Sequence, residues 1–247
     1  MEMLDVPHYA SEPGASPPLS WPDYRSTQLR APSRAPVVLP QRLTEVTGPL
    51  FGEDRVAAND GDLTRQSSGE PLGQRILVQG RVRDSDGRPV PDTLVEVWQA
   101  NAAGRYAHER DTWPAPLDPH FSGLGRVVTD AEGRYRFTTV RPGAYPWGNH
   151  HNAWRPAHIH FSLFGRAFTQ RLVTQMYFPD DPLMEYDPIA QSVPSTSRGR
   201  LVSAFSLADT QPEWSLAYTW DIVLRGRGAT PFEDPSSTDA TGSQDPA

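Results

Sequence analysis

Residues 75–87 read Arg-Ile-Leu-Val-Gln-Gly-Arg-Val-Arg-Asp-Ser-Asp-Gly. Apolar side chains at positions 76, 78 and 82 alternate with polar side chains at positions 79, 81 and 83. Alternation with a period of two is typical of a half-buried β-strand, and the Asp-Ser-Asp-Gly that follows is typical of a tight turn. This stretch therefore predicts a strand followed by a turn, which is the repeating unit of an antiparallel sheet.

Similar short runs recur along the chain and are separated by turn residues. The strands that we expect cover 94–99, 135–139, 157–163, 170–178 and 218–225. Only one short helix is predicted, near 195–206, with Ser195 as its cap. Many short strands with frequent turns and one short helix predict an all-β protein built as a β-sandwich.

Three regions follow from composition. Residues 1–70 are rich in proline and polar residues and show no sustained helical period, so they are expected to form an extended arm. Residues 71–233 are expected to form the β-sandwich domain. Residues 234–247 are polar and poor in apolar side chains, which predicts a disordered tail.

Bulk composition excludes several classes of function. The net charge is -7, and no basic stripe runs through the sequence, so a nucleic-acid partner is not expected. No apolar run is long enough to cross a membrane, and the start of the chain has no basic segment followed by an apolar one, which together predict a cytoplasmic protein. The chain has no cysteine, so disulfides and thiolate zinc sites are excluded.

The segment Trp154-Arg155-Pro156-Ala157-His158-Ile159-His160-Phe161 carries the strongest indication of function. On a strand, His158 and His160 point to one face while Ile159 and Phe161 point to the other. Two imidazoles on one face can bind a single metal ion. Taken alone, however, a His-x-His pair is more often a hydrogen-bonded or exposed pair than a pair of metal ligands.

Tyrosines near this pair suggest which metal it would bind. Tyr145 lies just upstream, and Tyr106, which by itself would be an ordinary turn aromatic, is the candidate for a second tyrosine. A phenol has a pKa of about 10 and stays protonated unless a strong Lewis acid displaces its proton. A hard trivalent ion with two imidazoles is well matched by two phenolates, which favours ferric iron.

The run from Gly80 to Gly226 resembles the intradiol ring-cleaving dioxygenases, and within them those that act on protocatechuate. The matching motifs, in chain order, are Leu94-Val95-Glu96-Val97-Trp98-Gln99-Ala100-Asn101, Gly104-Arg105-Tyr106, Ala115-Pro116-Leu117-Asp118-Pro119, Tyr145-Pro146-Trp147, Trp154 to His160, and Asp221-Ile222-Val223-Leu224-Arg225-Gly226. The likeness also takes in Pro22-Asp23-Tyr24 and Thr47-Gly48-Pro49, so it covers most of the chain.

This resemblance implies a non-haem Fe(3+) centre and a set of site residues. The metal ligands that it implies are Tyr106, Tyr145, His158 and His160. Tyr145 would also take up a substrate proton, Arg155 would stabilise negative charge on the ring, and Gln175 would support Arg155. The substrate pocket that it implies is lined by Tyr24, Trp98, Trp147 and Ile189. From the residues alone, a surface or structural arginine is the favoured interpretation of Arg155, and the pocket residues could equally be plain core.

The resemblance also implies a reaction and a partner. The enzyme would cleave protocatechuate (3,4-dihydroxybenzoate) with O2 to 3-carboxy-cis,cis-muconate, with Tyr24 at the carboxylate end of the substrate. Gly148 departs from the basic residue that some relatives carry after the Tyr-Pro-Trp motif, so carboxylate recognition would differ in part. A non-identical alpha chain of the same fold would complete a hetero-oligomer.

Two alternatives remain open from the sequence. One is a catechol or hydroxyquinol intradiol dioxygenase, although the proline-rich arm does not resemble the helical dimerisation segment of those enzymes. The other is a non-enzymatic transthyretin-like β-sandwich binding module, which residues 80–84 through 133–137 also resemble. Those modules lack the paired tyrosines and the His-x-His pair.

Overall fold

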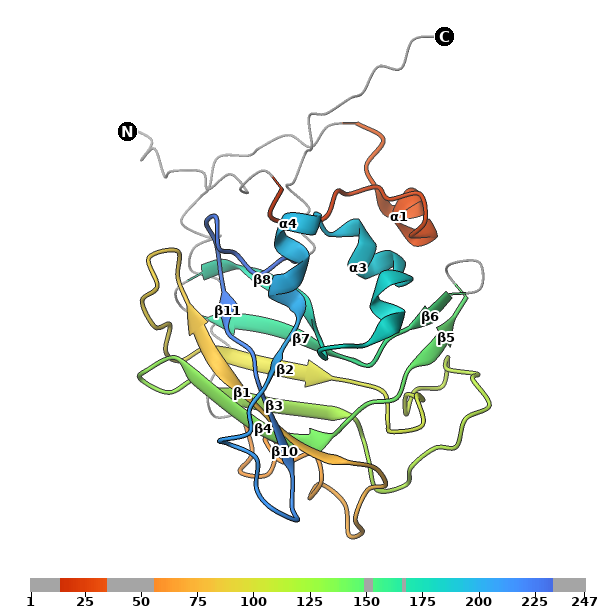
Figure 1. Cartoon of the computed structure of the whole chain (residues 1–247), viewed down its shortest axis with the longest axis vertical. Coiled ribbons are helices and arrows are strands. Elements are labelled where there is room, and N and C mark those ends of the chain that lie inside the picture. The colour runs from red at the N-terminus through yellow and green to blue at the C-terminus, as the bar shows by residue number, and fades with distance from the viewer. Residues whose placement is uncertain (1–13, 35–55, 149–152, 166–167, 233–247) are drawn as a thin grey trace, which may run out of the picture.

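A computed structural model describes residues 14–34, 56–148, 153–165 and 168–232 of the chain. Two larger sheets form the centre of the described structure (Figure 1), and a further pair of strands forms a small two-stranded sheet. The predicted β-sandwich is confirmed, but the described residues contain several short helical segments where the sequence analysis predicted only one. The strands are β1 (Arg75–Arg83), β2 (Leu94–Trp98), β3 (Leu124–Val128), β4 (Arg134–Val140), β5 (Tyr145–Trp147), β6 (Ala153–Arg155), β7 (His158–Gly165), β8 (Phe168–Tyr177), β9 (Ala204–Phe205), β10 (Leu216–Thr219) and β11 (Ile222–Val223).

The first sheet is built around β1. Strand β4 pairs antiparallel with one edge of β1, while β10 and β11 pair parallel with its other edge, and β9 continues the sheet beyond β10. The predicted alternation of β1 holds, because the side chains of Ile76, Val78 and Val82 are fully buried. These side chains point into the space between the two sheets.

The second sheet has the order β3-β2-β7-β8, and all its pairs are antiparallel. The ring of Phe161 on β7 lies 5.9 Å from the ring of Phe137 on β4 and 4.8 Å from the ring of Trp220. Aromatic pairs at such distances pack edge to face and bury large apolar areas. The odd-numbered residues of β7 therefore face the core, and its even-numbered residues face away from it.

Short helical segments gather at one end of the sheets, above β7 and β8 in Figure 1. They are α1 (Arg25–Arg30), η2 (Pro182–Glu185), α3 (Pro188–Ser192), α4 (Ser195–Arg198) and η3 (Gly199–Leu201). The helix predicted near 195–206 is present but ends at Leu201. Residues 204 and 205 instead pair with β10, because the next backbone groups bond to the sheets, as in Ser203 N to Tyr177 O at 2.9 Å. Ser195 is not its cap, since Pro194 occupies that position.

The described part of the predicted arm, 14–34 and 56–70, is mostly irregular but contains α1. Leu63 is fully buried in the core, and Asp62 forms a bridge with Thr138 on β4. The tail predicted at 234–247 lies outside the described residues, and the three-part division of the chain stays a prediction. Among the described residues, the helices are too short or too polar to span a membrane.

Candidate active site

Four side chains converge on the face of β7 that points away from the core. The Nε2 atoms of His158 and His160 lie 3.2 Å apart. The Tyr145 hydroxyl lies 3.3 Å from Nε2 of His158, and the Tyr106 hydroxyl lies 3.1 Å from Nε2 of His160. The structure thus brings together the two imidazoles and two phenols that the sequence analysis had paired as metal ligands.

Local structure explains why these side chains point to one another. The Nδ1 atom of His158 lies 2.7 Å from the carbonyl of Pro156, so a protonated Nδ1 donates there and leaves the Nε2 lone pair facing the cluster. His160 stacks on the indole of Trp98, its cross-strand partner, with the ring centroids 4.8 Å apart and the planes 2° from parallel. Both imidazoles are therefore held in orientation before any ligand binds.

The tyrosines come from two segments that pack against each other. Tyr145 begins the β5–β6 hairpin, and Tyr106 ends a turn in which Gly104 has a positive φ of +78°. A Cβ atom on Gly104 would lie 2.1 Å from the carbonyl oxygen of Ala144. Only glycine allows this close approach, which sets the Tyr106 ring 5.5 Å from the Tyr145 ring.

The geometry and chemistry of the cluster fit a metal ion. Ligand bonds of about 2.0–2.2 Å from nitrogen or oxygen place neighbouring donor atoms roughly 3 Å apart, as they are here. Two imidazoles suit a transition metal, and two phenols can supply anionic oxygens to a hard, highly charged ion. This donor set fits ferric iron.

Burial affects the protonation of the cluster. Burial, followed by the nearby positive charge of Arg155, lowers the pKa of His158 well below its ordinary value and lowers the pKa of His160 to about 3. Burial, followed by the neighbouring Tyr145, raises the pKa of Tyr106 well above its ordinary value. The imidazoles are thus neutral and ready to bind a cation, while the Tyr106 phenolate requires one.

Arg155 lies beside the cluster and is itself buried, with 2 % of its surface exposed. Its Nε and Nη2 atoms donate to the carboxylate of Asp187 at 3.0 to 3.3 Å, and Nη2 also donates to Gln175 and to the Tyr177 hydroxyl. Burial by itself would lower the pKa of Arg155, but Asp187 and then Tyr177 outweigh it and raise that pKa well above its ordinary value. The guanidinium remains charged.

A cavity of about 410 Å³ opens beside the four side chains. Of the sequence-predicted residues, those that line it are Tyr24, Tyr145, Trp147, Arg155, His160, Gln175 and Ile189. Trp98 is not among its lining residues and acts on the site through its stack with His160. Tyr106 and His158 are not among its lining residues either, but they lie within hydrogen-bonding distance of His160 and Tyr145, which are. The predicted site is therefore one connected structure.

Three further residues of this site were missed by sequence reasoning. Arg30, at the end of α1, lines the cavity and sits 4.9 Å from the Tyr24 ring centre. Tyr177 and Asp187 belong to the Arg155 network. Only Asp187 had a local signal, because an aspartate followed by proline is typical of a helix start. That signal indicates a cap and gives no hint of the contact with Arg155.

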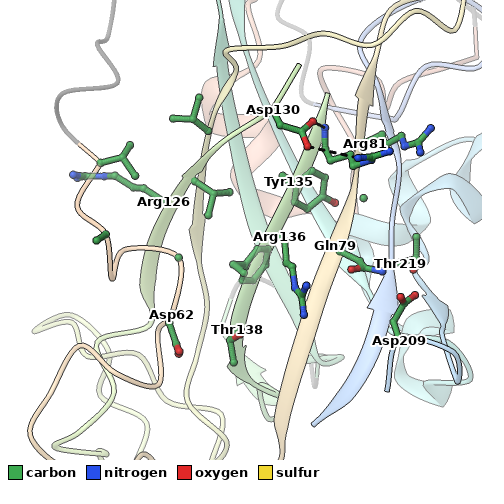
Figure 2. Close-up of a pocket in the computed structure, with 18 of the residues that line it drawn as sticks. Asp62, Gln79, Arg81, Arg126, Asp130, Tyr135, Arg136, Thr138, Asp209 and Thr219 are labelled. Carbon is green, nitrogen blue, oxygen red and sulfur yellow. Dashed lines mark hydrogen bonds and ion pairs between the residues drawn. The ribbon is translucent and has the colours of Figure 1, made fainter. Parts of the chain in front are cut away.

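A larger cavity of about 990 Å³ lies elsewhere, on the outer face of the first sheet (Figure 2). It mixes arginine and aspartate side chains from β1, β4 and the loops around them, including Arg81, Arg136 and Asp209. None of the sequence-predicted site residues lines it. Chemistry at the tyrosine and histidine cluster belongs to the smaller cavity.

Comparison with known proteins gives the class of this fold and site. Residues 46–226 match the family model described as "Dioxygenase", and residues 4–42 match the model "Protocatechuate 3,4-dioxygenase beta subunit N terminal". The chain therefore belongs to the intradiol dioxygenase family, as the resemblance in the sequence implied, and it is an enzyme rather than a binding module.

Comparison with individual relatives shows which members of the family the chain is similar to. The chain is 60% identical over 214 residues, 86% of its length, to the protocatechuate 3,4-dioxygenase beta chain of Burkholderia cepacia, of which it covers 91%. It is 31% identical over 165 residues to the alpha chain from the same organism, covering 66% of this chain and 78% of that one. Among solved structures, 3-chlorocatechol 1,2-dioxygenase from Rhodococcus opacus 1CP shares the fold, with a TM-score of 0.53 and 23% identity over 71% of this chain and 69% of that one. The chain is thus similar over most of its length to a protocatechuate 3,4-dioxygenase beta chain.

Proposed function

We propose that this chain binds ferric iron through Tyr106, Tyr145, His158 and His160 and cleaves the ring of protocatechuate. The observation that carries the proposal is the convergence of two phenols and two imidazoles within 3.1 to 3.3 Å beside a cavity. The reaction would break the ring bond between the two hydroxyl-bearing carbons. Both atoms of O2 would enter the product, 3-carboxy-cis,cis-muconate, so no external reductant is needed.

Three side chains beside the proposed metal centre, Tyr145, Arg155 and Gln175, would have different roles in the reaction. When bound, a ferric ion supplies a Lewis acid that lowers the pKa of the catechol hydroxyls. Tyr145 lines the cavity and, as a phenolate, can take up one substrate proton. Arg155 keeps its charge, so it can stabilise the negative charge that develops on the ring as oxygen attacks. Gln175 would hold Arg155 in place.

Groups that could recognise a carboxylated substrate also line the cavity. Arg30 and Tyr24 stand together there, and the Tyr24 ring lies 5.2 Å from the indole of Trp147. A guanidinium and a phenol can both donate to a carboxylate, while Trp147 and Ile189 offer apolar walls to the ring. These groups would also supply the recognition expected from a basic residue at position 148. The beta-chain relative named for protocatechuate supports the same choice.

We further propose that the working enzyme contains an alpha chain. Relatives of this chain include both beta and alpha chains of protocatechuate 3,4-dioxygenase. An alpha chain of the same fold would complete a hetero-oligomer with this one. A location in the cytoplasm stays a prediction.

A visible absorption spectrum of the iron-loaded protein, produced with and without an alpha chain, tests this function. We expect a broad tyrosinate-to-iron band that shifts when protocatechuate is added without oxygen. Admitting oxygen should then yield carboxymuconate. A colourless protein that takes up no iron, even with an alpha chain, would overturn the proposal, and faster turnover of catechol or hydroxyquinol than of protocatechuate would overturn the substrate.

A further inference from the structure

The Arg155 guanidinium is hydrogen-bonded along one edge, the edge formed by Nε and Nη2. The hydrogen bonds of its side chain to described residues all use Nε or Nη2. Asp187 accepts from both nitrogens, while Gln175 and Tyr177 accept from Nη2 alone. The Nη1 group takes part in none of these bonds, and Arg155 lines the cavity beside the four converging side chains. Among the described residues, none is hydrogen-bonded to Nη1, which makes this the nitrogen of Arg155 that could bind a ligand in the cavity.

Asp187 is the only carboxylate among these acceptors in the described residues, and it is fully buried. Its Oδ2 accepts from Arg155 Nη2 at 3.0 Å and from the Tyr177 hydroxyl at 2.9 Å. Its Oδ1 accepts from Arg155 Nε at 3.2 Å. A carboxylate that takes two nitrogens of a planar guanidinium fixes its plane as well as its position.

The Asp187 carboxylate also positions Ile189, which is part of the apolar wall of the cavity. Oδ1 accepts from the backbone N–H of Ile189 at 3.2 Å, which makes Asp187 the N-cap of α3. Ile189 lines the cavity. One buried side chain thus joins the charged corner of the cavity to the segment that carries its apolar side.

We infer that Asp187 is a positioning residue that aims the Arg155 guanidinium at the reacting ring. This inference rests on the proposed function. It assigns to Asp187 no contact with substrate or metal, since the hydrogen bonds of its carboxylate go to Arg155, Tyr177 and Ile189. The effect on ring cleavage that we assign to Asp187 passes through Arg155, and its cap on α3 is a separate, structural contribution.

A double-mutant cycle tests this route of action. The chain, produced with an alpha chain and loaded with iron, is compared as wild type, Arg155→Ser, Asp187→Asn and the double variant. Asparagine keeps the size of the side chain and its capping ability but loses the charge. We expect Asp187→Asn to lower kcat about tenfold while KM changes less than threefold. Iron content and the visible band should stay as in the wild type.

The decisive comparison is in the Arg155→Ser background. If Asp187 acts through Arg155, adding Asp187→Asn there should lower kcat by less than twofold. An equal loss in both backgrounds would overturn the inference, because it would mean that Asp187 acts through the helix cap. A KM that rises as much as kcat falls would overturn it too. If the wild type neither binds iron nor turns over protocatechuate, the proposed function fails, and that result is distinct from any result of the cycle.

Two further variants cover the case in which Asp187→Asn does not fold. Asp187→Glu keeps the charge but moves the carboxylate by one methylene group, and we expect it to fold with a reduced kcat and unchanged iron content. Wild-type kcat in a folded Asp187→Glu would contradict the inference. Asp181→Asn is the matched control, because Asp181 caps the preceding η2 through Leu183 N–H. It also accepts from the backbone N–H of Ala157 at 3.1 Å, and neither bond involves the Arg155 side chain. Its kcat should stay within twofold of the wild type.

Discussion

Tyr106 shows most directly what one side chain contributes to the centre. Its hydroxyl lies 3.1 Å from Nε2 of His160, and its ring meets that of Tyr145 edge to face. Tyr106→Phe keeps the ring and removes one donor atom. Losing a supporting residue of a metal site costs roughly 10–100-fold in affinity, so losing a ligand should cost at least about tenfold. Iron content after dialysis against a weak chelator measures this.

Tyr186→Phe is the control for that experiment, because Tyr186 is 71 % exposed and lies outside the cluster. It should bind iron as the wild type does. The visible band of Tyr106→Phe should also weaken, since one of two phenolates is gone. Full iron content and full turnover in Tyr106→Phe would remove Tyr106 from the ligand set.

Arg30 is the residue through which we expect selectivity for an acid group. Arg30→Gln should raise KM for protocatechuate by about three- to tenfold, because an exposed charge pair contributes only about 1 kcal/mol. KM for catechol, which has no carboxylate, should stay unchanged. Arg25→Gln, on the same helix but outside the cavity, is the control. Equal changes in KM for both substrates would show that Arg30 does not bind the carboxylate of protocatechuate.

The residues of the site differed in how far the sequence could reveal them. The pairing of His158 with His160 follows from strand geometry alone, since residues two apart share a face. Asp187 is thirty-two positions from Arg155, and the two meet only because η2 and α3 fold back over the strands. No local pattern records that contact. Arg30 reaches the cavity from the predicted arm, whose position in the fold no sequence pattern indicates.

At the scale of elements, the turn at Gly104 holds together the two segments that carry the proposed iron ligands Tyr106 and Tyr145. Gly104→Ala would force a left-handed residue, at about 1–2 kcal/mol, and would add a clash with the carbonyl of Ala144. We expect a total loss of stability of about 3 kcal/mol and a lower iron content, because Tyr106 and Tyr145 would be pushed apart. Urea unfolding and iron analysis measure the two effects.

Gly87→Ala provides a matched control for that turn. Gly87 has a nearly equal φ of +80°, but a Cβ atom there would meet nothing within 4 Å. Gly87→Ala should lose only the stability that the left-handed backbone conformation costs, about 1–2 kcal/mol, and should bind as much iron as the wild type. Equal losses of stability and iron in both variants would mean that contact between the two segments is unimportant to the site.

Strands and helices were more predictable where apolar and polar side chains alternated regularly along the sequence. The alternation in β1 was enough to place its apolar residues in the core, as the burial of Val78 and Val82 confirms. The helix near 195–206 was predicted too long because its apolar residues fit a helical face equally well. Backbone bonds from residues 203 and 206 to the two sheets end the helix early. Such bonds depend on the whole fold and leave no local signal.

The whole molecule couples the stability of the sandwich to the site, since β7 carries core residues on one face and the two histidines on the other. Phe161 packs against Tyr135, Phe137 and Trp220 of the opposite half. Phe161→Ala should cost about 3–5 kcal/mol in urea unfolding. Phe205→Ala, at a side chain 47 % exposed, should cost less than about 1 kcal/mol. Because the proposed iron site needs the folded positions of β7 and its neighbours, excess iron should raise the unfolding midpoint of both variants. Midpoints that stay unchanged with iron in both variants would show that the proposed site is not coupled to folding.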